Sequence, residues 1–241
     1  MTSAIRIDAF HAVRVLPMSS KRFLPWLASR RAPAATIEIG KPKALYVEPV
    51  SRVEADVNGE SLWFESPDAA LDPAPDAFAA AVIPAAAFRN ARLIMAVPPD
   101  ATLVANAYRV LEVMRGWWGW PRDPQTVLGG LAGQVSAPPD EPIPVERGVG
   151  LCFSGGVDSF YSLLRADQPI DTLVMAHGYD IPVSDDVRMQ AAEESLRQVA
   201  ADLGIRAVVI RTNLRKHSLW RRSPWGRSHG GPTAPLGHLL R

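Results

Sequence analysis

Short apolar runs separated by turn residues predict β-strands in the first part of the chain. The runs 53–57 and 60–64 flank Asn58-Gly59. This dipeptide is the strongest short hairpin signal, because both turn positions need a positive φ. Weaker alternating patterns predict further strands over 5–16 and 36–39. The hydrophobic pattern therefore places a β-hairpin and flanking strands before residue 65.

Two helices and one returning strand are expected next. The alanine-rich segment 76–90 predicts a helix, with Asp76 as its N-terminal cap and Pro84 kinking or dividing it. Residues 92–97 return as a strand. Residues 100–115 predict a second helix, because apolar side chains recur there at helical spacing. These positions are Leu103, Val104, Ala107, Val110, Leu111 and Met114.

The last third of the chain alternates strand and helix patterns. Strands are expected over 148–153, 172–176 and 206–210, and helices over 159–165 and 185–203. Ser184 is the expected cap of the longer helix, and Gly204 its end. Short connections in a β-α-β-α-β order imply a parallel sheet with right-handed crossovers.

A proline-rich stretch suggests how the chain is organised. Residues 136–147 contain four prolines and little apolar content, which is typical of an extended linker. This linker is expected to divide the chain into an α+β region over 1–135 and an α/β domain over 148–241. The tryptophan cluster at 117–120 favours packing over ligand stacking.

Composition and charge narrow the class of protein. The 241 residues are 47% hydrophobic and 21% charged, as in an ordinary globular protein. The net charge is +1, but no acidic residue follows Asp202. That basic segment either helps to hold polyphosphate or nucleic acid, or forms a solvated, poorly ordered tail.

The cysteine count and the N-terminal sequence indicate in which cellular compartment the protein is expected. Cys152 is the only cysteine, so no disulfide forms within the chain, and its strand position predicts a buried structural thiol. The N-terminal residues lack the apolar core of a signal peptide. No apolar run approaches the roughly 20 residues that span a bilayer. A cytoplasmic location is the expectation.

The most specific chemistry lies in the hexapeptide Ser154-Gly155-Gly156-Val157-Asp158-Ser159, between a predicted strand and a predicted helix. Its glycines let the backbone approach a ligand closely. The first N–H groups of the next helix lack intrahelical partners, and the helix dipole adds positive charge there, so an anion is the natural ligand. Asp158 makes sense mainly beside a divalent cation, so phosphate with Mg²⁺ fits best.

This hexapeptide resembles the SGGxDS loop of the PP-loop ATP pyrophosphatases, an adenine nucleotide alpha-hydrolase-like superfamily. All six positions match, and the resemblance covers 148–213. It implies a doubly wound, Rossmann-like (HUP-type) domain, and ATP and Mg²⁺ as ligand and cofactor. The loop, Ser154 to Ser159, would hold the phosphates, with Asp158 as metal ligand. Three strands are fewer than such domains carry, so an incomplete domain is expected.

Further candidates follow the second and third strands, at the carboxyl edge where ligands of parallel sheets bind. His177 is either a nucleotide contact acting as an acid or base, or a structural histidine, and Asp180 is either a metal or ribose ligand or a turn residue. Lys216 is the candidate catalytic cation, with Arg215 and Arg211, because cations offset charge on a leaving polyphosphate. A polar-aromatic segment that could close over the nucleotide contains Trp220, Trp225, His229 and Gly230.

Three functions remain open at this point. The resemblance implies an ATP-dependent adenylating ligase or synthetase that releases AMP and pyrophosphate on an unidentified small-molecule acceptor. The short sheet favours instead a nucleotide-binding module without turnover. The basic C-terminal segment weakly supports a tRNA-modifying enzyme. A homo-oligomer is compatible with each.

Overall fold

The computed structural model describes residues 35–135 and 148–240, all of which fall in one compact unit. The described strands are β1 (Thr36–Ile39), β2 (Lys43–Val47), β3 (Val50–Val57), β4 (Glu60–Ser66), β5 (Arg92–Met95), β6 (Gly150–Cys152), β7 (Thr172–His177) and β8 (Arg206–Thr212). The described helices are α1 (Pro75–Arg89), α2 (Ala101–Trp118), α3 (Pro124–Ala132), α4 (Val157–Leu164), α5 (Asp186–Leu203), α6 (Trp225–Ser228) and α7 (Gly230–Leu239).

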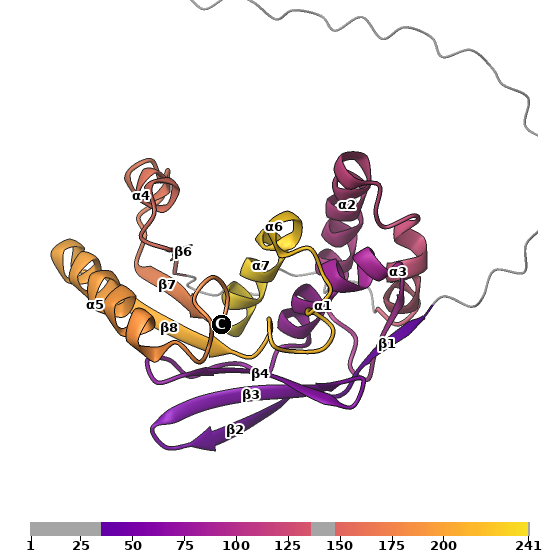
Figure 1. Ribbon diagram of the computed structural model, residues 1–241, viewed down its shortest axis with the longest axis horizontal. Coiled ribbons are helices and arrows are strands. Elements are labelled where there is room, and N and C mark those ends of the chain that lie inside the picture. The colour runs from indigo at the N-terminus through magenta and orange to yellow at the C-terminus, as the bar shows by residue number, and fades with distance from the viewer. Residues whose placement is uncertain (1–34, 136–147, 241) are drawn as a thin grey trace, which may run out of the picture. The chain divides into compact units, whose positions relative to one another are not determined.

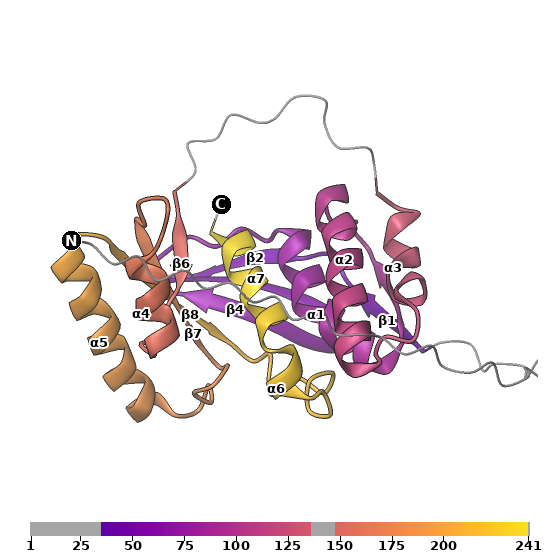
Figure 2. The same cartoon turned by 90° about the horizontal axis from the view of Figure 1, so that it is seen from above.

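The eight strands form one mixed sheet in the order β5-β1-β3-β4-β8-β7-β6, and β2 also pairs with β3. Pairing is parallel within β6, β7 and β8 and between β1 and β5. It is antiparallel from β1 through β3 and β4 to β8. Helices α4 and α5 lie on one side of β6–β8, and α1, α6 and α7 on the other (Figures 1 and 2). The α/β class is thus confirmed.

The predicted hairpin is confirmed as β3–β4. Asn58 has φ 54° and Gly59 has φ 82°, the positive values that a tight two-residue turn requires. The strands run longer than the apolar pattern indicated, because β3 continues back to Val50. The weak strand 36–39 is also confirmed as β1, whereas the segment 5–16 lies outside the described residues.

The predicted β-α-β-α-β unit is confirmed by the parallel pairs Leu151↔Leu173 and Leu173↔Ala207. The sheet does not end with this unit. β8 pairs antiparallel with β4 through Phe64↔Thr212, so strands from both sides of the predicted linker share one sheet. The linker itself, 136–147, lies outside the described residues.

Helix α1 corrects two expectations. It begins after Ala74, so Asp76 is not its cap. Asp76 is buried in the first turn, and its Oδ1 accepts the backbone N–H of Asp100 at 2.7 Å. Pro84 lies inside one continuous helix and does not divide it. Contacts of α1 with α2 and α7 outweigh the local capping and proline signals of the sequence.

The boundaries of α5 are one residue from the prediction at the start and agree with it at the end. The cap is Asp185, not Ser184, and its carboxylate accepts the N–H of Arg188 at 3.1 Å. Gly204 ends the helix in the left-handed conformation with φ 66°, as expected.

The C-terminal segment is not a poorly ordered tail. α7 buries Leu236 and Leu239 in the main core and packs along α1. The contact is close: a Cβ on Gly231 would lie 2.5 Å from Cγ of Pro84. Small residues on both helices permit this approach, a pattern that hydrophobic periodicity does not reveal.

Candidate functional site

The hexapeptide forms the turn between β6 and α4, as predicted. Gly155 has φ 75°, and no atom lies within 4 Å of the position where a Cβ would stand. The glycine is therefore required by the backbone conformation and not by lack of space. Gly156 follows as the N-cap of α4, with an extended backbone.

Two serine hydroxyls hold this loop from within. The Ser159 hydroxyl donates to the carbonyl of Gly156 at 2.8 Å, and the N–H of Gly156 donates to Ser154 Oγ at 3.4 Å. The two hydroxyl oxygens are 3.4 Å apart. Ser159 is buried, whereas Ser154 is exposed. Ser159 thus stabilises the loop conformation from within, and Ser154 lies on its exposed side.

The outer side of the loop is open. Gly155, Gly156, Val157 and Asp158 are all exposed. Among the described residues, no acceptor pairs with the backbone N–H groups of Val157 and Asp158. No hydrogen-bond donor or cation in that part of the chain contacts the Asp158 carboxylate. Unpaired N–H groups at a helix start carry partial positive charge. The loop therefore keeps the donors that an anion would need.

His177, at the end of β7, is buried and serves the next turn. Its Nε2 lies 2.9 Å from the carbonyl of Pro182. Gly178 follows with φ 115°, and a Cβ there would lie 2.0 Å from the carbonyl oxygen of Thr212. Of the two roles expected for His177, the geometry favours the structural one.

Asp180 belongs to a cluster that also contains Tyr179, Arg215 and Trp225, named here the Trp225 cluster. The indole Nε1 of Trp225 donates to Asp180 Oδ1 at 3.1 Å. The Arg215 guanidinium lies 4.7 Å from the Trp225 ring centroid and donates to the carbonyl of Tyr179 at 2.6 Å. Asp180 is therefore already engaged by a side chain that the sequence separates from it by 45 residues.

Tyr179 is the residue of this cluster whose role sequence reasoning missed. It is buried, and its hydroxyl donates to the carbonyl of Pro232. Burial raises the pKa of the phenol above its ordinary value. The side chain thus ties the turn after β7 to the start of α7. An aromatic residue two positions after a buried strand was the only available signal.

Most side chains around the end of β8 make contacts that support the sheet. The amide oxygen of Asn213 accepts the Trp63 N–H at 3.0 Å, and its amide nitrogen donates to the carbonyl of Ser61. Arg211 lies 3.3 Å from Asp186. Lys216 is exposed, and no ion-pair partner contacts it among the described residues. Of the predicted cations, Lys216 alone has neither an ion pair nor a ring contact in that part of the chain.

The expected polar-aromatic covering divides into two parts. Trp220 is buried, and its Nε1 donates to the carbonyl of Ala81 at 3.2 Å. Trp225 is half-buried and His229 is exposed, with its Nδ1 3.3 Å from the Trp225 carbonyl. Trp220 therefore belongs to the core, and only the second pair lies at the surface.

Cys152 also departs from expectation. The residue is exposed and is not the buried thiol that was predicted. Neighbouring groups nevertheless remove part of the water around its sulfur, and this desolvation raises the pKa of the thiol. A raised pKa disfavours the reactive thiolate.

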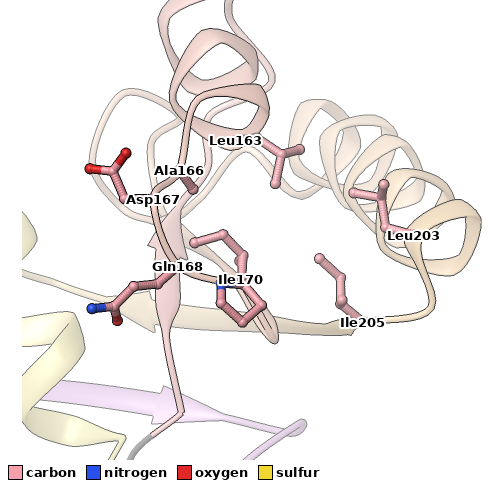
Figure 3. A pocket seen from close by; sticks show the side chains of 8 residues that line it. Leu163, Ala166, Asp167, Gln168, Ile170, Leu203 and Ile205 are labelled. Carbon is pink, nitrogen blue, oxygen red and sulfur yellow. The ribbon is translucent and has the colours of Figure 1, made fainter.

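One cavity of the described residues lies at the opposite end of the parallel strands from the loop. A cavity of about 310 Å³ opens between the ends of α4 and α5, at the amino ends of β7 and β8 (Figure 3). Its lining includes Leu163, Ile170, Leu203 and Ile205. Asp167 and Gln168 also line it, so its surface is mixed in polarity. Because the hexapeptide leaves the carboxyl end of β6, this hollow is not part of the loop site.

Neither a cluster of metal-ligating side chains nor a membrane-spanning helix is found in the described ranges. Three or more metal-ligating side chains do not converge anywhere within 35–135 and 148–240. No helix in these ranges is both long and apolar enough to cross a bilayer.

Comparisons of the chain with models of protein families, with curated proteins and with solved structures gave no match.

Proposed function

We propose that the loop from Ser154 to Ser159 binds the triphosphate of ATP, and that β6–α4–β7–α5–β8 is a Rossmann-like, HUP-type nucleotide-binding unit. The observation that carries the proposal is the open loop itself. Gly155 holds a left-handed conformation, and the first N–H groups of α4 are exposed without protein acceptors among the described residues. Such donors at a helix start suit phosphate oxygens.

Each loop residue has a separate task in this proposal. The N–H groups of Val157 and Asp158 and the hydroxyl of Ser154 donate to phosphate oxygens. Ser159 keeps the loop in shape through Gly156. Mg²⁺ is commonly held by one or two carboxylates together with substrate phosphates, so the exposed Asp158 fits as its protein ligand. When bound, Mg²⁺ offsets negative charge on the phosphate oxygens.

The leading reaction is adenylation with release of pyrophosphate. An acceptor oxygen attacks the α-phosphorus of ATP, the bond to the β-phosphate bridging oxygen breaks, and pyrophosphate departs with both electrons of that bond. A nitrogen nucleophile then displaces AMP from the adenylated acceptor. The protein contributes positioning and charge stabilisation, and Lys216 is the cation available to neutralise the leaving pyrophosphate.

A second candidate, ATP binding without turnover, rests on the contacts after β8. Arg211 is paired with Asp186, and Asn213 is bonded to β4. These side chains support the sheet, so fewer groups remain to stabilise charge on a leaving group. The same loop would then bind Mg-ATP as a regulatory or storage ligand.

Titration calorimetry with Mg-ATP tests the binding step shared by both candidates. Asp158→Asn should weaken binding at least about tenfold, equivalent to 1.4 kcal/mol, and the loss should disappear when Mg²⁺ is removed. Asp167→Asn is the matched control, because Asp167 is an exposed carboxylate just beyond the other end of α4. Equal affinity of wild type and Asp158→Asn would refute the assignment.

Pyrophosphate release distinguishes the two candidates. The wild-type chain is incubated with Mg-ATP and a panel of carboxylate, amide and modified-base acceptors. Acceptor-dependent release that Lys216→Met abolishes, with Mg-ATP affinity retained, supports the adenylating enzyme. Tight binding with no release across the panel supports the module without turnover.

A further inference from the structure

Helix α4 carries an apolar stripe that the described residues leave largely uncovered. Val157, Phe160, Tyr161 and Leu164 recur at the spacing that places side chains on one face of a helix. They are 39 to 84% exposed. The opposite side of the helix packs onto the sheet through Leu163. The Phe160 ring packs edge-on against the buried Phe153, with 5.0 Å between ring centroids. Val157, Tyr161 and Leu164 remain 63 to 84% exposed on the outer face of this eight-residue helix, an apolar surface that favours a partner.

Among the described helices, α2 buries one stripe, Val104, Ala107, Leu111 and Met114, but its other face also has three exposed apolar side chains, Val110, Val113 and Trp117, which are 47 to 72% exposed. The stripe on α4 differs from them in its place at the end of the sheet. α4 lies at the β6 end of the sheet (Figure 1), and within the described residues β6 pairs with β7 alone. The exposed stripe thus coincides with the end of the sheet that has no further described strand.

The charges beside the stripe indicate what covers it. Asp158 and Arg165 are seven residues, about two turns, apart, so they lie on the same flank at opposite ends of α4. The Arg165 guanidinium lies 5.9 Å from the Tyr161 ring centroid, beside the stripe. When two such helices pack antiparallel, Asp158 of one is level with Arg165 of the other. The twofold repeats this contact, whereas a parallel arrangement would place the charged flanks of the two helices on opposite sides of the interface and form neither pair.

We propose that the α4 stripe is an isologous interface with a second copy of this chain. A twofold axis perpendicular to the helices makes them antiparallel and packs the two stripes against each other. It also forms two reciprocal Asp158–Arg165 pairs. Self-complementarity of both shape and charge is the condition for such a contact. Asp158 is also the proposed Mg²⁺ ligand, so the dimer contact and Mg-ATP compete for its carboxylate, and the test of the dimer is made without nucleotide.

Light scattering during size-exclusion chromatography measures the mass directly. At about 100 μM, a dissociation constant of about 1 μM leaves the chain mostly dimeric, at twice the monomer mass of 26.2 kDa. Tyr161→Glu should give monomers. Val187→Glu is the matched control, because it adds the same charge to an apolar side chain on α5 that is 84% exposed. Both variants alter exposed positions, and their near-ultraviolet circular dichroism verifies folding.

A charge variant tests the orientation of the helices. Arg165→Glu opposes like charges twice across the twofold and should weaken the dimer about tenfold, whereas Arg188→Glu on α5 should not. A wild-type chain that remains at 26.2 kDa overturns the proposal. A dimer that survives Tyr161→Glu unchanged also overturns it, because the interface then lies elsewhere.

Discussion

Alanine substitutions at two glycines can distinguish an effect on nucleotide binding by the loop from the cost of backbone strain. Gly155 and Gly204 have φ values of 75° and 66°, and neither has an atom within 4 Å of a prospective Cβ. Alanine at either position therefore meets no clash, and only the left-handed conformation is penalised. That penalty is roughly 1–2 kcal/mol. Each variant should lose about 2–4 °C in melting temperature per kcal/mol, as expected for a chain of this size.

The two variants should differ in nucleotide binding. Alanine at 155 relieves its strain by moving φ to negative values, which redirects the N–H groups at the start of α4. Mg-ATP affinity should fall at least about tenfold, or 1.4 kcal/mol. Gly204→Ala, at the far end of α5, should bind as wild type does. Calorimetric titration measures both, and equal affinity of the two variants would refute the reasoning from the loop conformation.

Three other outcomes test the packing around the site. Gly178→Ala places a Cβ 2.0 Å from the Thr212 carbonyl oxygen and should cost more than about 3 kcal/mol of unfolding free energy in urea; a near-neutral effect would contradict the described turn. Tyr179→Phe removes the donor to a backbone carbonyl at the start of α7 and should cost about 1–3 kcal/mol, measured by thermal melting, with no loss expected if that bond is absent. The pKa of Glu54 is lowered first by its hydrogen bond from Lys43, so the stabilisation is present in full above the ordinary pKa of 4.5 and is lost as the pH falls through the lower folded-state value. Lys43→Met should therefore be less stable than wild type at neutral pH and as stable as wild type in acid. A difference in unfolding free energy that persists in acid would contradict this pH dependence.

The core contacts of the C-terminal segment explain its unusual composition. α1 is rich in alanine, and α7 contains glycine and proline at the contact. A Cβ on Gly231 would lie 2.5 Å from Cγ of Pro84, so the helices approach closely. Trp220 adds a bond from its indole to the carbonyl of Ala81. Composition that resembles a disordered tail is here the composition of a tight helix–helix contact.

Local signals predicted most of the elements and few of their partners. The hairpin at Asn58-Gly59 and the end of α5 at Gly204 follow from backbone torsions that few residues adopt. The cap at Asp76 was wrong because the carboxylate serves a neighbouring helix start at Asp100. The pairing of β4 with β8 was not predicted, because strand patterns specify which face is buried but not which strand lies alongside.

For the candidate site, the sequence by itself determined the loop from Ser154 to Ser159, because strand, glycine turn and helix start are contiguous and short-range. Only the tertiary structure decided that this loop is open, that His177 supports a turn, and that Asp180 is bonded to Trp225. These outcomes depend on groups far apart in the chain, whose approach is governed by packing of the whole core. The local hydrophobic pattern does not predict that packing.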